Sequence, residues 1–397
     1  MPSRSPALPP VLWLLAVGTV AIGTDAFVIA GVLPRIATDL EVSTATAGQL
    51  VTVFSLTYAV SAPVSAGLTG GLSRRTVLRW ALALFVAGNL LTAAADSYPL
   101  AMAGRVLAAL GAASYTPQAS AAASSLVAEE RRGRALGIVI GGLTVATALG
   151  VPLGTFVGEA LGWRATLLLV ALLGVVALAG SVLLPVLVPA GRSTVAQRLA
   201  GLRSRPVLAT LTVTLLAVMA EHVLYTYIGS VLSPATGGDG RTLATLLFVF
   251  GIGAVVGNAV AGPATDRWGA RVVLVVAVAG MTADLALAPW WSRSLPLAVA
   301  AMFLWGVTGW MYLVPQQHRL LELSAAAGPF TVALNSSALY LGIGLAGAVG
   351  GVLLRVADAP GLAVPAALLG AAALSLALAA YRPRRDSTAD AGARAGR

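Results

Sequence analysis

Asp25, Arg105 and Glu221 are ionisable side chains that lie inside long apolar runs of the sequence. A charged group at the centre of a bilayer costs about 2.5–3.5 kcal/mol on insertion scales, so such groups usually face a protein interior or a water-filled cavity. Burial favours the protonated form of a carboxyl group, whereas a nearby arginine favours the ionised form. A carboxylate held between these influences can take up and release a proton as its surroundings change. The three residues are therefore candidates for proton coupling.

Asp25 and Arg105 fall at similar depths in their apolar runs. Asp25 lies eight residues before the end of the run at 11–33, which is roughly 12 Å along a helix. Arg105 lies six residues after the start of the run at 99–127, which is roughly 9 Å. The spacing predicts an ion pair. Either the pair opens when Asp25 takes up a proton, or it is static and orders this part of the fold.

Glu221 and His222 are neighbours in another run, so on a helix their side chains point about 100° apart. Glu221 shares a helix face with Tyr225, and together these two side chains could bind cationic or polar groups. The alternative is that one of the neighbouring pair faces a helix–helix contact and forms a hydrogen bond there.

A further stripe is formed by Trp305, Gly309, Tyr312 and Gln316, at positions i, i+4, i+7 and i+11. On a continuous helix these side chains share one face. In a cavity they would offer an aromatic surface and a polar end to a drug-like ligand; a packing stripe or an interfacial anchor is the alternative. The candidate substrate-binding residues are Asp25, Tyr115, Glu221, His222, Tyr225, Trp305, Tyr312 and Gln316.

Membrane helices must position these residues. Of 397 residues, 58% are hydrophobic and only 10% are charged, against roughly 25% charged in a soluble domain. Each helical crossing needs about 20 apolar residues, and the runs lack the alternating polarity of barrel strands. We predict an all-α membrane protein with twelve transmembrane helices. The runs lie at about 11–33, 47–69, 78–95, 99–127, 134–157, 165–188, 207–232, 242–263, 271–290, 296–316, 330–353 and 362–381.

The arginines predict the orientation of these helices. They cluster in alternate loops, at 74–79, 131–134, 192–205 and 267–271 and in the tail at 382–385. Because basic loops stay in the cytoplasm, both termini should be cytoplasmic, and we expect a bacterial inner (plasma) membrane. This pattern accounts for the net charge of +10 better than a nucleic-acid partner does.

The chain is expected to consist of two halves. We predict a six-helix half at 1–188, a cytoplasmic linker at 189–206, a second six-helix half at 207–381 and a disordered cytoplasmic tail at 382–397. Similar loops, GLTGGLSRRTVL and GPATDRWGARVVL, begin 195 residues apart at Gly67 and Gly262. The same offset carries Asp25 to within one residue of Glu221, so each half holds one carboxylate at a matching place.

Several segments resemble motifs of the major facilitator superfamily. GPATDRWGAR is similar to its loop signature, GLTVATALGVPLG to its glycine/proline antiporter motif, and AGRVLAALGAA to its fourth-helix arginine motif. GTDAFVIAGVLPRIATDL resembles the first helix of twelve-span drug/proton antiporters, and LNSSALYLGIGLAGAVGG and YTYIGSVL resemble the arabinose-efflux and chloramphenicol-resistance branch. The residues matched as conformational motifs are Gly67, Arg74, Arg75, Gly150, Pro152, Gly154, Gly262, Asp266, Arg267, Gly269 and Arg271.

The resemblance implies that the glycine/proline motif seals the outer side and that the loop motifs contact each other as the halves rock. Generic small-residue helix packing is the alternative for the glycine/proline motif. One departure stands out, because Gly71 occupies the place where the first-half loop of the family usually has aspartate. The contact made by this loop must therefore differ from the family's, or be carried by the second half.

The resemblance implies a secondary transporter, which we expect to be a proton-coupled exporter of a small drug-like molecule working by alternating access. The alternatives are an exporter of sugar- or nucleoside-like metabolites, a uniporter or importer without proton antiport, and, with less support, a membrane receptor or enzyme. The expected partners are a small-molecule substrate, protons and the lipid bilayer, and we expect a monomer. No cofactor or metal is expected, because the chain has no cysteine and only two histidines.

Overall fold

The computed structural model describes residues 9–69, 71–128, 131–185, 200–323, 328–356 and 358–381, and every regular element among them is a helix. Ten helical stretches of this part are long and apolar enough to cross a membrane. Two more helices occupy the remaining predicted spans. Of these, α5 (Tyr98–Ser125) is rich in alanine and serine, and α14 (Ala270–Ala286) has 17 residues. The predicted all-α fold is confirmed.

The first half consists of the helices before the predicted linker, and the second half of those after it. In the first half, α5 is accompanied by α1 (Val11–Asp39), α2 (Thr44–Ala47), α3 (Gln49–Leu68), α4 (Arg74–Ala93), α6 (Arg132–Val145), η2 (Ala146–Gly150), α7 (Val151–Leu161), α8 (Trp163–Gly180) and η3 (Ser181–Leu183).

The second half contains α14 and the helices on either side of it. They are α10 (Arg205–Tyr225), α11 (Ile228–Val231), α12 (Ser233–Thr236), α13 (Gly240–Trp268), α15 (Ala288–Trp291), α16 (Leu295–Met311), α17 (Leu313–Leu323), α18 (Gly328–Leu353), η5 (Ala359–Leu362) and α19 (Ala363–Ala380). Residues 189–199 of the predicted linker and the predicted tail 382–397 lie outside the described part. The division into domains therefore stays a prediction.

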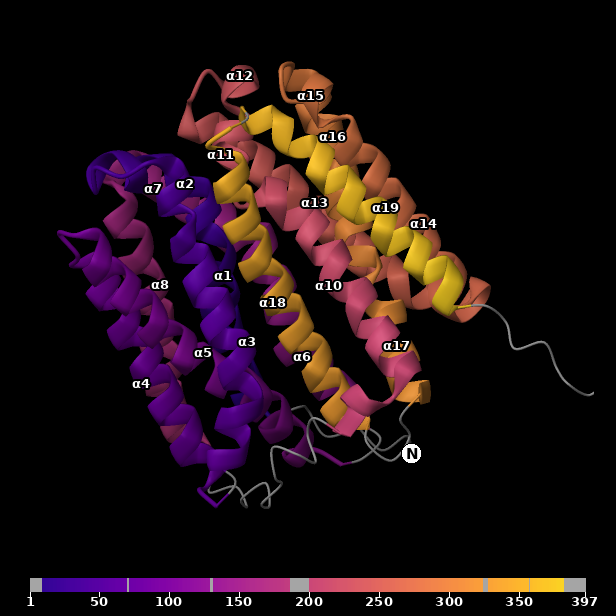
Figure 1. Ribbon diagram of the computed structural model, residues 1–397. Helices are drawn as coiled ribbons and strands as arrows, with labels where there is room; N and C mark the ends of the chain where they lie inside the picture. Colours follow the sequence, from indigo (N-terminus) through magenta and orange to yellow (C-terminus); the bar gives the residue numbers. More distant parts are fainter. Residues whose placement is uncertain are drawn as a thin grey trace, which may run out of the picture.

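The two ends of the bundle differ in charge. We call the end at which α4, α6, α10 and α14 begin the basic face; it lies toward the bottom of Figure 1. The opposite face, toward the top, is the end at which α1 and α7 end and α13 begins. Described arginines at the basic face are Arg74, Arg75, Arg79, Arg131, Arg132, Arg134, Arg203, Arg205, Arg267, Arg271 and Arg319.

The halves meet along two seams, where α3 packs against α18 and where α13 packs against η2 and α7. Toward the opposite face the first seam is closed by Tyr227, which follows α10 and is fully buried. Its hydroxyl donates to the carbonyl of Gly347 in α18 at 2.7 Å. Gly48 of the first half leaves room for this ring, because a Cβ there would lie 2.2 Å from the Tyr227 hydroxyl.

Toward the basic face, three glycines of α6 lie in more open surroundings. A Cβ built at Gly133, Gly137 or Gly141 would have no atom within 4 Å, and the same is true of Gly262 in α13. The halves are thus tightly packed around Tyr227, whereas these four glycines leave open space toward the basic face.

Substituting Gly48→Ala is expected to prevent full closure of the opposite face, because the methyl group would overlap the ring of Tyr227. The chain contains no cysteine, so spin labels can be attached to cysteines introduced by Thr38→Cys and Arg241→Cys without first removing native cysteines. Double electron–electron resonance should show, in this variant, an additional and longer distance between the two spin labels. Gly133→Ala is the matched control; an unchanged distance distribution for Gly48→Ala would contradict the prediction.

Candidate functional site

The structure brings Asp25 and Arg105 together in the core of the first half. Arg105 Nη1 lies 2.5 Å from Asp25 Oδ1, and both side chains are 0% exposed. The guanidinium also donates from Nε to the carbonyl of Leu50 at 3.4 Å and lies 4.2 Å from the ring centroid of Phe54. The arginine is therefore locked by α1 and α3 at once. The role of this pair in proton coupling stays a prediction.

The Asp25 carboxylate is only partly satisfied. Its Oδ1 accepts from Arg105, whereas Oδ2 is buried without a hydrogen-bond partner among the described residues. Buried polar oxygens are usually hydrogen-bonded, so an unpaired acceptor at this position is unusual. Asn89 is a further polar side chain close to this carboxylate.

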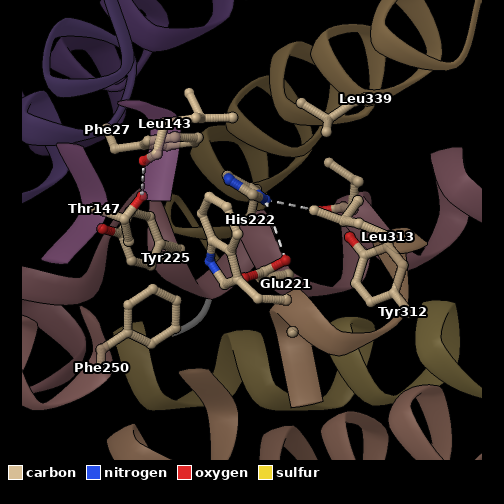
Figure 2. A pocket seen from close by; sticks show the side chains of 13 residues that line it. Phe27, Leu143, Thr147, Glu221, His222, Tyr225, Phe250, Tyr312, Leu313 and Leu339 are labelled. Carbon is tan, nitrogen blue, oxygen red and sulfur yellow. Dashed lines mark hydrogen bonds and ion pairs between the residues drawn. The ribbon is translucent and has the colours of Figure 1, made fainter. Parts of the chain in front are cut away.

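A cavity lies between the halves, close to the middle of the bundle. The space free of atoms within it, including the part open to solvent, measures about 450 Å³. Its wall is formed by α1, η2 and α6 of the first half and by α10, α13, α16, α17 and α18 of the second. Its lining residues are Phe27, Leu143, Thr147, Val218, Glu221, His222, Tyr225, Phe250, Gly309, Trp310, Tyr312, Leu313 and Leu339. Figure 2 shows Glu221 and His222 near its centre, between Tyr225 on one side and Tyr312 on the other.

Glu221 is the one carboxylate among the described residues that line the cavity. Its Oε2 lies 4.0 Å from His222 Nδ1, and that nitrogen lies 3.0 Å from the carbonyl of Val218. A carbonyl oxygen only accepts, so Nδ1 carries a hydrogen and Nε2 is left for another partner. Gly309 leaves space for the acid, because a Cβ there would lie 2.9 Å from Glu221 Oε1. The cavity thus combines one acid group with one imidazole.

Aromatic rings form the other wall of the cavity, with Tyr225 at their centre. Its ring lies 6.3 Å from that of Phe27, edge to face, and 5.3 Å from that of Phe250. Trp305 stands behind these rings, 6.1 Å from Tyr225 and fully buried. Such a wall suits the apolar or ring-shaped part of a ligand, and aromatic faces also attract a cation.

Three predicted substrate residues besides Asp25 do not line the cavity. Trp305 lies one layer behind it. Tyr115 is buried within the first half, where its hydroxyl donates to the carbonyl of Leu15 at 2.8 Å. Gln316 is fully buried within the second half. The predicted residues that do line it are Glu221, His222, Tyr225 and Tyr312.

Gln316 belongs to a hydrogen-bond network in the core of the second half. Its Nε2 donates to Thr214 Oγ1 at 3.0 Å and to the carbonyl of Thr210 at 3.2 Å, and its Oε1 accepts from the hydroxyl of Tyr381. Asn335 extends the network by accepting from Thr214 at 2.8 Å. The helix carrying the predicted stripe breaks at Tyr312, between α16 and α17. This break turns Gln316 away from the cavity.

Gln316→Leu is expected to lower the stability of the fold without changing which molecules it binds. The substitution leaves Tyr381 and Thr214 buried without this partner, at a cost of about 1–3 kcal/mol. Thermal unfolding in detergent measures the loss, and transport of a compound panel measures selectivity. Gln317→Leu is the matched control, because Gln317 is only half-buried and has no hydrogen bond among the described residues. A changed substrate profile with unchanged stability would contradict the prediction.

Sequence reasoning missed the aromatic residues Phe27 and Phe250. Phe27 follows Asp25 by two positions, about 200° around a helix, so a side chain that points away from Arg105 could have been inferred there. Phe250 lies in an apolar stretch with no polar neighbour to mark its face. The remaining lining residues, among them Leu143, Thr147 and Leu339, carry no signal that separates them from packing residues.

The residues matched as conformational motifs lie in or next to the loops at the basic face and in the fifth span. Arg75 Nη2 donates to the carbonyl of Val182 at 3.0 Å, which ties the start of α4 to the end of the sixth span. Gly269 has a φ of +82°, which lets the chain turn between α13 and α14. Asp266 and Arg267 are exposed, and no ion pair joins Asp266 to another described residue. Gly67 and Gly262 end up in α3 and α13, and Gly150, Pro152 and Gly154 in the break and second part of the fifth span.

The comparisons with known proteins agree with this architecture. A family model described as Major Facilitator Superfamily matches residues 15–315. The chain belongs to the major facilitator superfamily. The resemblance seen in the sequence is thereby confirmed, and the protein is a multi-pass membrane transporter of small molecules, not an enzyme.

Bacterial relatives of this major facilitator superfamily member are similar over most of their length. The inner membrane transport protein YdhP of Escherichia coli (strain K12) is 32% identical over 86% of this chain and 88% of its own. A chloramphenicol resistance protein of Streptomyces lividans is 36% identical over 69% of this chain and 70% of its own. The MFS-type transporter YbcL of Bacillus subtilis is 31% identical over 87% of this chain and 88% of its own.

Among solved structures, the superfamily fold is shared with a D-xylose–proton symporter. The two superpose with a TM-score of 0.76, at 14% identity, over 94% of this chain and 97% of the symporter. At this identity the likeness concerns the fold alone. It supports the predicted all-helical transporter fold.

Proposed function

We propose that this transporter exports a small drug-like molecule in exchange for protons, by alternating access. The observation that carries the proposal is the position of Glu221, the one carboxylate among the described residues that line a cavity between the two halves. A carboxylate cannot hold a proton and a cationic or hydrogen-donating ligand group at full strength together. Entry of one therefore favours release of the other, which is the requirement for antiport.

The shape of the cavity supports a compact amphipathic substrate. Polar groups from Glu221, His222 and Tyr312 lie along one part of its wall, and the rings of Phe27, Tyr225 and Phe250 along another. A ligand with one polar or positively charged group and an apolar ring system meets both parts. The chloramphenicol resistance protein among the relatives supports efflux of a drug-like compound.

The orientation follows from charge. With the basic face in the cytoplasm, both termini lie inside and the opposite face meets the outside of a bacterial inner membrane. The close packing around Tyr227 and Gly48 then corresponds to a state closed to the outside. The membrane potential adds about 2.3 kcal/mol per charge per 100 mV to the inward driving force on protons. Each chain lines its own cavity, so a monomer is sufficient.

Asp25 is proposed as a second proton-handling group, coupled to the cavity without touching it. Its pairing with Arg105 and its unpaired Oδ2 support a carboxyl group whose proton is exchanged when the pair opens. The alternative is a static ion pair. In that case a variant that lacks both charges but still folds should couple transport to protons normally.

Purified protein in liposomes tests the proposal. A panel of small cations, neutral drugs, sugars and nucleosides is offered with and without a pH gradient, and proton movement is followed with an internal pH dye. We expect the pH gradient to drive transport of at least one drug-like compound, and we expect protons to move in the opposite direction. Transport that ignores the gradient would favour a uniporter, and transport confined to sugars or nucleosides would favour a metabolite exporter.

A further inference from the structure

The helix of the fifth span is interrupted by a π-turn, η2 (Ala146–Gly150), between α6 and α7. Within it the backbone N–H of Val151 donates to the carbonyl of Ala146, five residues earlier. Pro152 follows immediately and lacks an N–H, so the carbonyl of Ala148 cannot receive the usual helical bond. The proline therefore accounts for the turn. Single π-turns inside α-helices are often found at functional sites.

One side of this turn supports the part of α1 that carries Asp25. A Cβ built at Gly150 would lie 2.0 Å from the hydroxyl of Thr24, the residue before Asp25. A Cβ at Gly23 would lie 2.7 Å from the Cβ of Ala146. Thr24 and Asp25 are both fully buried, so the carboxylate cannot move unless this contact changes.

The other side of the turn meets the second half of the protein. A Cβ at Gly251 in α13 would lie 2.4 Å from the Cα of Ala148 and 2.8 Å from the carbonyl oxygen of Thr147. These are backbone atoms, which cannot swing away as the end of a side chain can. The side chain of Thr147 also lines the cavity. The five residues of η2 thus contact the segment that carries Asp25, the cavity and the second half.

We propose that the π-turn is the positioning element of Asp25, and that it carries the movement of the second half to this carboxylate. Asp25 is sealed from the cavity, so a change in the cavity must reach Asp25 through packed atoms. The turn has a second arrangement, in which the N–H of Val151 bonds to the carbonyl of Thr147, four residues earlier, as in an ordinary α-helix, in place of that of Ala146. Movement of α13 at Gly251 biases this choice, and the choice sets where Gly150 holds Thr24. This inference rests on the proposed role of Asp25 in proton coupling.

Infrared titration of the carboxyl band of Asp25, identified by its loss in Asp25→Asn, provides a readout that needs no substrate. Two variants disturb the turn from different sides: Pro152→Ala removes the cause of the π-turn, and Gly251→Ala inserts a methyl group against Ala148. In the same span, Gly141→Ala is the matched control, because its Cβ would meet no atom within 4 Å. Monodispersity and thermal unfolding establish that each variant is folded.

We expect both variants to move the titration midpoint of the Asp25 band by about one pH unit, a tenfold change in its protonation equilibrium. Gly141→Ala should leave the midpoint unchanged. If the wild-type band titrates and neither variant moves it, the positioning role is overturned while the proposed function stands. If the wild-type band does not titrate at all, the proton-handling role of Asp25 fails and this inference fails with it. Because the two variants act independently, one that does not fold leaves the other to decide.

Discussion

Replacing Asp25 or Arg105 alone with alanine is expected to destabilise the protein by about 3–5 kcal/mol, because each change leaves the other charge buried without its partner. Both side chains are fully buried and Arg105 is held by α1 and α3, so neither water nor another side chain can replace the missing group. Thermal or denaturant unfolding in detergent measures the loss. Arg35→Ala, which breaks the partly exposed pair with Glu159, should lower stability by only about 0–1 kcal/mol.

The double substitution Asp25→Leu with Arg105→Met separates the two interpretations of this pair. Replacing a buried ion pair with apolar side chains of similar volume is often neutral for stability or even stabilising. We therefore expect the double variant to fold about as well as the wild type, yet to lose transport driven by a pH gradient. A double variant that folds and still couples transport to protons would show that the pair is static.

The second large effect is expected for Glu221→Gln. The substitution keeps the size and hydrogen-bonding ability of the side chain but removes its charge and its ability to exchange a proton. We expect a loss of at least about tenfold in gradient-driven accumulation, equivalent to about 1.4 kcal/mol. Exchange of labelled for unlabelled substrate without a gradient should be retained for neutral compounds. Transport into liposomes, with and without the gradient, measures both.

The matched control for this experiment is Glu322→Gln. Glu322 lies at the basic face, its side chain is 64% exposed, and it contacts His318 on the same helix at 3.4 Å. It is an acid of the same type outside the cavity, so its substitution should leave both modes of transport unchanged. If Glu221→Gln still accumulates a substrate against its gradient at the wild-type level, the proton is carried elsewhere.

The two acids differ in what can reach them. Glu221 lines the cavity and can meet a ligand directly. Asp25 is sealed beside Arg105, and the packing of α1 against η2 is one connection between its segment and the cavity. We therefore propose that a ligand competes with a proton at Glu221 by contact, and that Asp25 responds to movement of the helices around it. The two predictions above test these roles separately.

The sequence alone was sufficient for the all-α fold and for the depth of its buried charges. The length of each apolar run is set by bilayer thickness, and a charge placed within such a run must find a partner or a cavity. These constraints act locally, so they are readable without knowledge of packing. Asp25 and Arg105, predicted at one depth from spacing alone, are in direct contact in the structure.

Which side chains face the cavity was decided only by the tertiary structure. The rotation of a helix about its axis depends on how its small residues pack against neighbouring helices. Most of these helices are apolar around their whole circumference, so the sequence does not mark which face points into the cavity. The break between α16 and α17 redirected Gln316 into a core network, and the packing of α1 against α5 buried Tyr115. Phe27 and Phe250 reached the cavity for the same reason. Periodicity predicts which residues share a face, but only packing decides where that face points.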